Sequence, residues 1–255
     1  MTLEHYLEDK PLAYAHFDPH RIVRIWKNIA FELPECVRLI GTNGKGTTGR
    51  FIAQTLFAHN KKVGHYTSPH IHKINERFWI NGEACNDTQL EAHHQALFSL
   101  LSPNERSSLS YFEYTTLLAL HLFKELDIIV LETGLGGEFD ATNIITPFLT
   151  LITPIDYDHQ LFLGESITEI ATTKLNIHSQ KVIMGYQKHS EVADIAKEMS
   201  LKNHFELLFL EDVYPYDTRV LYLENNRKLA HLALEHLGFS LRLEEIDAPA
   251  LFGRC

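Results

Sequence analysis

The short stretch at residues 41–48 (GTNGKGTT) limits the fold more than any other part of this sequence. An apolar run at residues 36–40 (CVRLI) comes before it, and residues 49–58 follow with a helical pattern. Strand, glycine-rich turn and helix in this order bring backbone N–H groups and a helix N-terminus to face an anion. Lys45 adds a cation, and the threonines that follow it can offer a hydroxyl to Mg²⁺. The stretch therefore predicts a site for nucleotide phosphates.

The spacing of this stretch differs from that of the usual phosphate-binding loop. The usual loop has four residues between its first glycine and its Gly-Lys pair, whereas two residues separate Gly41 from Gly44 here. The alternative interpretation is a plain Gly/Asn-rich turn between a strand and a helix. The strand–turn–helix context favours the phosphate site over that turn.

Apolar runs and helical patterns alternate along most of the chain. Runs typical of buried parallel strands lie at residues 36–40, 62–66, 127–131, 148–152 and 181–184. Helical patterns lie at residues 87–101, 111–125 and 190–199, and Ser166 opens another with a capping-box signature. This alternation predicts an α/β fold of the P-loop NTPase type, a mainly parallel sheet flanked by helices.

The two ends of the chain and one short excursion complete the prediction. Residues 1–35 have a helical pattern, in which Asp18 is the N-cap before Pro19, and residues 77–82 indicate a hairpin around an Asn-Gly turn. Near the C-terminus we expect a small terminal β pair and then a helix stopped by Gly238, at residues 205–210, 219–223 and 226–237.

Composition restricts the partners of this protein. A net charge of -10 argues against non-specific binding to DNA or RNA, because phosphate backbones need a basic face. The three cysteines are far apart and no CxxC occurs, so neither a disulfide framework nor a zinc site is indicated. No apolar run approaches the length of a membrane span, and the N-terminus lacks the features of a signal peptide. We therefore expect a cytoplasmic protein, most simply a monomer.

Several chemically active side chains follow the predicted strands. Because ligands of open parallel sheets bind beyond the carboxyl ends of the strands, Ser68, Glu132 and His159 are expected near the phosphate loop. Their oxygen ligands suit Mg²⁺. Taken singly, each has an ordinary structural explanation, as a turn residue, a salt-bridged strand end and a loop histidine. Lys174, on the helix that Ser166 opens, would by itself be a solvated lysine.

Six segments together resemble one known family. They are GTNGKGTT (41–48), YTSPH (66–70), NERFWING (75–82), YFEYTT (111–116), LETGLGGEFDATNI (131–144) and DHQLFLG (158–164). Their order and spacing resemble the folylpolyglutamate synthase/dihydrofolate synthase family, which belongs to the Mur-ligase-like ATP-dependent amide-forming ligases. The resemblance implies the Mur ligase central-domain fold. It also implies ATP-dependent addition of L-glutamate to dihydropteroate, to reduced folates, or to both, through an acyl phosphate.

The resemblance also implies roles for particular residues. Contacts to ATP are implied for Thr42, Asn43, Gly44, Lys45, Gly46, Thr47, Thr48, Asn226 and Arg254. Two Mg²⁺ ions are implied, one on Thr47 and Ser68 and a second between Glu132 and His159. The residues implied for the pterin are Phe17, Asp18, Phe112, Asp140 and Ala141. The catalytic residues are Lys45, His159 and Lys174, the last in the position of a lysine that CO₂ carbamylates.

Some positions depart from the family pattern. Thr173-Lys174-Leu175-Asn176-Ile177 stands where the family usually has Glu-Lys-Ala-Gly-Ile, and Pro154 replaces a common serine. Family members carry a further Rossmann-like domain that completes the ATP and glutamate sites. We expect residues 1–240 to form the ATP-binding domain and residues 241–255 to begin a linker toward such a C-terminal domain.

Two other functions remain open. One is a Mur-type ligase that acts on a cell-wall precursor, against which the YFEYTT and DATN segments argue. The other is a truncated, catalytically silent protein that binds ATP or pterin. The small-molecule partners would be dihydropteroate or a reduced folate, L-glutamate and ATP.

Overall fold

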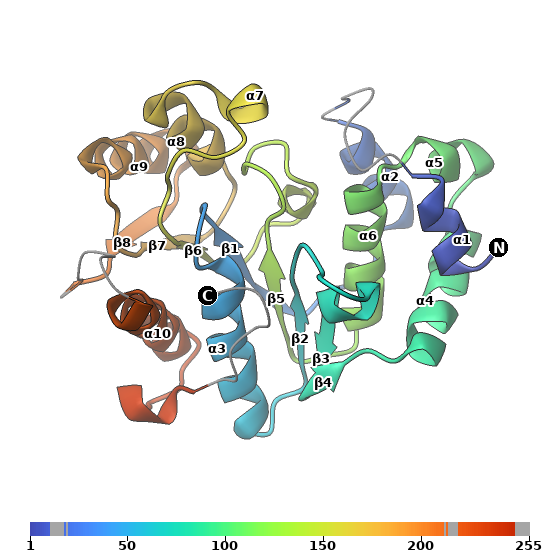
Figure 1. Cartoon of the computed structure of the whole chain (residues 1–255), viewed down its shortest axis with the longest axis horizontal. Helices are drawn as coiled ribbons and strands as arrows, with labels where there is room; N and C mark the ends of the chain where they lie inside the picture. The colour runs from blue at the N-terminus through green and yellow to red at the C-terminus, as the bar shows by residue number, and fades with distance from the viewer. Residues whose placement is uncertain (11–17, 19, 212, 214–218, 248–255) are drawn as a thin grey trace.

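A single mixed sheet of eight strands forms the centre of the protein (Figure 1). The computed structural model describes residues 1–10, 18, 20–211, 213 and 219–247. The strands are β1 (Glu35–Ile40), β2 (Val63–Tyr66), β3 (Phe78–Ile80), β4 (Glu83–Ala84), β5 (Ile128–Glu132), β6 (Leu149–Ile152), β7 (Lys181–Met184) and β8 (Glu206–Phe209). The helices are α1 (Leu3–Glu8), α2 (Arg21–Ile29), α3 (Lys45–Ala58), α4 (Asp87–Leu100), α5 (Pro103–Ser108), α6 (Tyr111–Phe123), α7 (Gln160–Leu163), α8 (Ile167–Leu175), α9 (Ser190–Asn203) and α10 (Arg219–His236).

The order of the strands creates a crossing point at β1. The order is β4-β3-β2-β5-β1-β6-β7-β8, parallel from β2 to β8, with β3 and β4 joined antiparallel at one edge. The chain runs from β1 toward the β2 side and returns after β5 to β6 on the other side of β1. Ligands of parallel sheets bind at such a crossing point, beyond the carboxyl ends of the strands. The predicted α/β fold with a mainly parallel sheet is confirmed.

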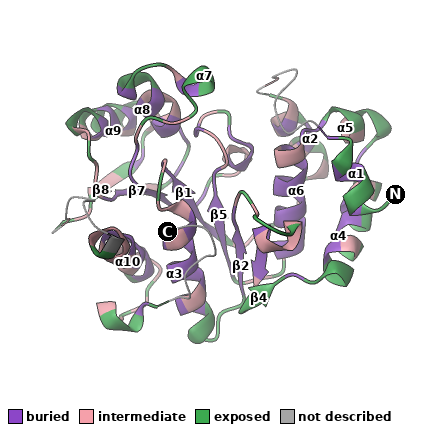
Figure 2. Ribbon diagram, viewed as in Figure 1, coloured by how far each residue is buried: buried purple, intermediate pink, exposed green. Residues whose placement is uncertain are grey.

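Helices cover both faces of the sheet, which explains why its central strands are buried and mostly apolar. Every residue of β5 and β6 is buried, and so is β1 after its first residue. In β1, Val37 and Leu39 pack in one cluster with residues of α3 and α10. Cys36 and Ile40 point to the opposite face, Cys36 toward α4 and α6 and Ile40 toward α8 and α9. Figure 2 shows the central strands and α6 as the most deeply buried elements.

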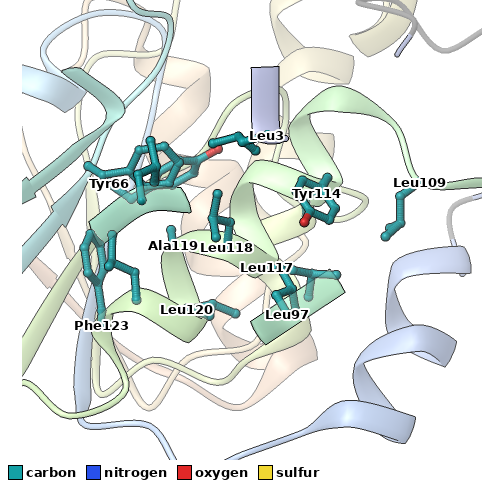
Figure 3. Packing of buried hydrophobic residues seen from close by; sticks show 14 of the residues in the cluster. Leu3, Tyr66, Leu97, Leu109, Tyr114, Leu117, Leu118, Ala119, Leu120 and Phe123 are labelled. Atoms are coloured by element: carbon teal, nitrogen blue, oxygen red, sulfur yellow. The ribbon is translucent and has the colours of Figure 1, made fainter. Parts of the chain in front are cut away.

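Helix α6 is the centre of the cluster on the β2 side of that face (Figure 3). All its residues from Glu113 to Phe123 are buried, so that it contacts the sheet on one side and α1 and α4 on the other. A capping box between Ser110 and Glu113 fixes its start. Burial of a large aliphatic side chain contributes roughly 1.5–3 kcal/mol, so this helix is a main source of stability for the fold.

Several predicted local structures are confirmed. The hairpin around Asn81 and Gly82 joins β3 to β4, and the capping box of Ser166 and Glu169 opens α8. β7 has the predicted bounds. The prediction that Asp18 caps α2 is wrong, because the N-cap is His20. Asp18 instead accepts a hydrogen bond from the backbone N–H of His20 through its carboxylate (3.0 Å).

The prediction of a terminal β pair is wrong in its second member. Residues 219–223 are the first residues of α10, and β8 joins the main sheet parallel to β7 instead of pairing with them. A short apolar run fits a buried strand or a helix equally well. What decides is packing along the rest of α10, where residues such as Leu229 and Leu234 contact the cluster under α3. Asn226 therefore lies within α10 and does not open a helix.

The core continues beyond α10. Ile246 is fully buried in the same cluster, and the His231 ring lies 2.6 Å from the carbonyl oxygen of Leu241. Among the described helices, none has both the length and the apolar character needed to cross a membrane.

Candidate functional site

The predicted phosphate loop connects β1 to the N-terminus of α3. Gly44 is the N-cap with φ +91°, a backbone conformation that glycine adopts most easily. Helix α3 begins at Lys45, four residues earlier than the sequence pattern indicated. The backbone N–H groups of its first turn, at residues 45–47, have no partner within the helix, and they lie at the positive end of its dipole. This geometry provides an anion site.

The first half of the loop is fastened to the segment that follows β6. A Cβ atom at Gly41 would lie 2.1 Å from the hydroxyl oxygen of Thr153, so only glycine fits there. The backbone N–H groups of Thr42 and Asn43 both donate to the carbonyl oxygen of Pro154 (2.8 and 3.3 Å). The Thr42 hydroxyl donates to the Asp156 carbonyl oxygen (3.0 Å). Thr42 and Asn43 therefore hold the loop in place through their present contacts, and the amides left for an anion are those of α3.

Two lysine side chains meet at one backbone carbonyl. Lys45 Nζ donates to the carbonyl oxygens of Gly41 (3.0 Å) and Thr42 (3.2 Å), and Lys174 Nζ also donates to that of Gly41 (3.1 Å). Lys174 is only 2% exposed. Burial, with repulsion from Lys45 as a smaller cause, lowers the pKa of Lys174 to about 8. Lys174 therefore lies beside the phosphate loop.

Glu132, at the end of β5, is buried beside the segment that follows β2. Its Oε2 atom accepts hydrogen bonds from the Thr67 hydroxyl and from the backbone N–H of Ser68 (3.1 Å). Glu132 is 4% exposed. Glu132 and Ser68 therefore come together as the sequence predicted, with Thr67 as a further partner that the sequence did not reveal.

His159 is an exposed residue at the start of α7. It is the N-cap of α7 with φ +47°, its side chain is 53% exposed, and its Nε2 atom lies 3.4 Å from a carboxylate oxygen of Asp158. No hydrogen bond or ion pair joins His159 to Glu132 in the structure as described. The neighbouring Asp156 is held by Lys188 (3.2 Å) and His189 (3.0 Å), and its hydrogen bond with His189 is the main cause that lowers the pKa of the carboxyl.

Helix α10 contacts the phosphate loop through Asn226. The Thr48 hydroxyl donates to Asn226 Oδ1 (3.2 Å), and both residues are fully or almost fully buried. A Cβ atom at Gly44 would lie 2.7 Å from the same oxygen. The Asn226 Nδ2 atom is buried without a hydrogen-bond partner among the described residues. Asn226 thus lies against the loop.

Three residues predicted for the pterin gather around the loop that follows β5. Asp140 accepts hydrogen bonds from the backbone N–H groups of Gly134 (2.9 Å) and Leu135 (2.8 Å). It also caps the short turn Ala141–Ile144, so its carboxylate holds the loop together. The Phe112 ring lies where a side chain at Gly134 would be, 2.5 Å from a Cβ atom built there.

Of the remaining predicted site residues, the structure describes Asp18. Asp18 forms an ion pair with Arg24 (2.5 Å) near the start of α2. Phe17 and Arg254 lie outside the described residues. Sequence reasoning missed Thr67 and the Pro154 carbonyl, because a threonine or a backbone oxygen in a loop has no distinguishing pattern.

The side chains near the loop suit magnesium. Mg²⁺ binds through one or two carboxylates and takes its other ligands from water and substrate phosphates. Glu132 supplies a buried carboxylate, and Ser68 and Thr47 supply hydroxyls. In the described ranges, no group of three or more His, Cys, Asp or Glu residues could hold a metal alone. The residues present therefore fit an ion that shares its ligands with a nucleotide.

A cavity of about 390 Å³ lies beside Thr67, between α3 and the β3–β4 hairpin. Arg50 stacks over Trp79 in its wall, 4.8 Å from the ring centre. The residues that line it are Arg50, Thr67, Pro69, Ile71, His72, Glu76, Trp79, Gly82, Glu83 and Ala84.

Comparison with known proteins finds relatives in sequence and in structure, although no protein-family model matches. The chain is similar to a dihydrofolate synthase/folylpolyglutamate synthase from Haemophilus influenzae, with 45% identity over 157 residues. That match covers 60% of this chain and 35% of the relative. The chain thus spans about a third of the length of this curated relative.

Two solved structures have the same fold. The structure of Helicobacter pylori folylpolyglutamate synthetase matches with a TM-score of 0.84 and 36% identity, over 99% of this chain and 67% of that chain. Escherichia coli FolC in complex with DHPP and ADP matches with a TM-score of 0.78 and 28% identity, over 95% of this chain and 63% of that chain.

Proposed function

Because this chain belongs to the dihydrofolate synthase/folylpolyglutamate synthase family, we propose that it binds ATP for the addition of L-glutamate to dihydropteroate, to reduced folates, or to both. The observation that carries the proposal is the turn that opens α3, with Lys45 beside it and the Glu132–Ser68 pair at the neighbouring strand ends. Phosphate, cation and carboxylate positions are thereby brought to one edge of the sheet.

The first turn of α3 would receive the ATP phosphates. The N–H groups of Lys45, Gly46 and Thr47 point along the helix axis, so phosphate oxygens accept from them and lie at the positive end of the helix dipole. Lys45 now donates to two neutral carbonyl oxygens, and a phosphate is a stronger acceptor for its ammonium group. The hydrogen bond between Thr48 and Asn226 would hold the turn in its conformation.

Two Mg²⁺ ions would be held by the oxygen-bearing side chains, one by Thr47 and Ser68 and the other by Glu132 with His159. When bound, Mg²⁺ neutralises charge that grows on the phosphoryl group as it transfers. The hydrogen bonds from Thr67 and Ser68 fix the direction of the Glu132 carboxylate. His159, which is exposed, remains the least constrained member of this set.

Lys174 is the proposed site of carbamylation. Its pKa of about 8 leaves roughly a tenth of the amine neutral at pH 7. The ammonium group would first lose a proton to water; the neutral Nζ would then form a bond to the carbon of CO₂ and lose a second proton, so that overall a cation becomes an anionic carbamate. That anion would remove the repulsion between Lys174 and Lys45 and add an oxygen ligand near the phosphate loop.

The acceptor would lie against the loop that follows β5, on Phe112, Asp140 and Ala141, with Phe17 and Asp18 nearby. Its carboxylate takes the γ-phosphoryl group of ATP, so that an O–P bond forms and the bond to ADP breaks. The amine of L-glutamate then attacks the acyl carbon, an amide bond forms, and phosphate leaves with loss of a proton. Lys45 would stabilise the charge on the transferring group.

The proposal also covers the domain organisation, cellular location and oligomeric state of the protein. Residues 1–240 would be the ATP-binding domain, with a linker beginning at residues 241–255. The protein would act in the cytoplasm as a monomer.

One assay tests the proposal against its alternatives. Phosphate release from ATP is measured with dihydropteroate plus L-glutamate, with tetrahydrofolate plus L-glutamate, and with a UDP-muramoyl acceptor. We expect glutamate-stimulated release with at least one pteridine acceptor and none with the muramoyl acceptor. Binding of ATP and pterin without turnover would identify a silent binding domain, and release only with the muramoyl acceptor would identify a cell-wall ligase.

A further inference from the structure

A fully buried arginine lies in the central strand of the sheet. Arg38, in β1, is 0% exposed, and the side chains on either side of it along that face of the strand, Cys36 and Ile40, are apolar. Cys36 belongs to the cluster around α6 and Ile40 to the cluster around α8 and α9. The guanidinium group therefore lies between two apolar clusters, where an apolar side chain would be expected.

The contacts of Arg38 join two distant segments. Nη1 donates to the side-chain oxygen of Asn143 (2.8 Å) and to the carbonyl oxygen of Thr142 (3.5 Å). Nη2 donates to the carbonyl oxygen of His178 (2.7 Å). The Nε atom is buried and has no partner among the described residues.

The first segment is the loop at residues 134–144, which carries Asp140 and against which Phe112 of α6 packs. Asn143 belongs to the turn that Asp140 caps, and its Nδ2 atom donates to the carbonyl oxygen of Glu138 (2.9 Å). Asp140 in turn binds the backbone of Gly134 and Leu135. Arg38 thus acts through Asn143 on the whole of residues 134–144.

The second segment follows the helix that carries Lys174. His178 lies three residues after the end of α8. The two segments also touch directly, because the Glu138 N–H donates to the Thr173 carbonyl oxygen (3.1 Å). A Cβ atom at Gly137 would lie 2.2 Å from the carbonyl oxygen of Lys174. Arg38 lies beneath this junction and bonds to both sides of it.

Such a residue costs stability. Burial lowers the pKa of Arg38 to about 10, with partial compensation from the charge of Asp140, and the side chain stays charged at neutral pH. A buried charge with one orphaned donor is often replaceable by an apolar side chain without loss of stability. What the apolar side chain cannot replace is the fork of donors that holds two loops at a fixed distance.

We propose that Arg38 is a positioning residue, which fixes the loop at residues 134–144 against α8 so that the acceptor site keeps its distance from Lys174 and the phosphate loop. The inference rests on the proposed function for the identity of the acceptor. It does not depend on that function for the geometry of the loop.

The test compares Arg38→Met and Arg38→Lys with a matched control, Thr150→Val. Thr150 is the partner of Arg38 on β6, is fully buried, and donates from its hydroxyl to Ser179 (2.9 Å); among the described residues no hydrogen bond joins its side chain to residues 134–144. Three quantities are measured on the full chain: the dissociation constants of dihydropteroate and of ATP, and hydrogen exchange of the Gly134 and Leu135 amides.

For Arg38→Met we expect dihydropteroate binding to weaken about tenfold, a change of about 1.4 kcal/mol, while ATP binding changes less than twofold. The Gly134 and Leu135 amides should exchange faster than the loss of global stability explains. Arg38→Lys should be intermediate, and Thr150→Val should change neither ligand's affinity. Asn143→Ala should weaken dihydropteroate binding as well, and the double variant should lose less than the sum of both.

The inference would be overturned if Arg38→Met and Thr150→Val had the same dihydropteroate affinity and the same hydrogen-exchange rates at the Gly134 and Leu135 amides. If Arg38→Met does not fold, the same comparison is made between Asn143→Ala and Thr150→Val. If the unmodified protein fails to bind dihydropteroate, the proposed function fails, and amide exchange at Gly134 and Leu135 decides on Arg38 alone.

Discussion

Lys174 and Lys45 share a single backbone carbonyl beside the phosphate loop. Both ammonium groups donate to the carbonyl oxygen of Gly41, and Lys174 is almost fully buried. Two like charges in a desolvated site favour loss of one proton, which explains the direction of the shift in the Lys174 pKa. Binding of an anion, or conversion of Lys174 to an anion, would reduce the repulsion between the two ammonium groups.

The cost of burying Lys174 leads to a prediction on stability. Lys174→Met should raise the free energy of unfolding at pH 7 by about 2 kcal/mol, because each pKa unit corresponds to about 1.4 kcal/mol and the lost hydrogen bond offsets about 1 kcal/mol. The folded pKa of about 8 lies below that of the unfolded chain, near 10.5. Between these values the unfolded chain binds more protons, so the unmodified protein gains stability as pH rises and the advantage of Lys174→Met shrinks.

Urea unfolding at pH 7 and pH 10 measures this effect. Lys197→Met serves as the control, since Lys197 is exposed and pairs with the exposed Asp194. A lower stability of Lys174→Met at both pH values, with a constant difference from the unmodified protein, would disprove the strain assigned to Lys174.

At the scale of elements, the phosphate loop is held by close contacts from three sides. The end of β6 accepts the amides of Thr42 and Asn43, α10 meets Thr48 through Asn226, and Lys174 reaches in from α8. A loop fixed in this way before the nucleotide arrives loses less conformational entropy on binding.

The contact at Gly41 predicts a large effect of a small substitution. Gly41→Ala should lower stability by more than about 3 kcal/mol, because its Cβ would overlap Thr153 and its φ of +149° disfavours any side chain. Gly238→Ala is the matched control, with φ +86° and no atom within 4 Å of the added Cβ, and it should lose only about 1 kcal/mol. Thermal unfolding of both variants measures the difference, and similar losses would show that the loop can relax away from Thr153.

The hydrogen bond between Thr48 of α3 and Asn226 of α10 predicts that loss of the Thr48 hydroxyl and loss of its methyl group have different effects. Thr48→Val removes the hydrogen bond to Asn226 and should lower stability by about 1–3 kcal/mol, because Asn226 Oδ1 is left buried without it. Its ATP affinity should fall as well. Thr48→Ser keeps the hydroxyl and should retain ATP affinity. If Thr48→Ser loses as much ATP affinity as Thr48→Val, shape and not the hydrogen bond supports the loop.

The elements differ in how well the sequence predicted them. β1, β5 and β6 are predicted to within one residue, because a strand buried on both faces is mostly apolar. The start of α10 was not predicted correctly, because the pattern of Val220, Leu221 and Leu223 fits a strand equally well. In the structure Val220 is 75% exposed, unlike a residue of a buried strand. Only the packing of the later turns of α10 decides between the two.

At the scale of the whole molecule, the sheet order brings the site together. Loops from the ends of β1, β2, β5 and β6 meet at one edge because parallel strands end on the same side. This is why Glu132 and Ser68 could be expected near the phosphate loop from the sequence. The same reasoning expected His159 there too, although its side chain is exposed, and it could not place Lys174, which lies on α8. The hydrogen bonds of the buried Arg38 guanidinium and of the Pro154 carbonyl oxygen could not be predicted from the sequence. Their partners lie more than a hundred residues away, and no spacing rule relates them.

The central claim is that the turn opening α3 binds the phosphates of ATP with the help of Lys45. The most direct measurement is equilibrium binding of ATP with Mg²⁺, by calorimetry, to the unmodified protein, to Lys45→Ala and to the surface control Lys197→Ala. We predict binding by the unmodified protein and by Lys197→Ala, and at least a tenfold weaker affinity for Lys45→Ala, a loss of about 1.4 kcal/mol or more. Equal ATP affinity of Lys45→Ala and the unmodified protein, or no ATP binding by either, would contradict the account.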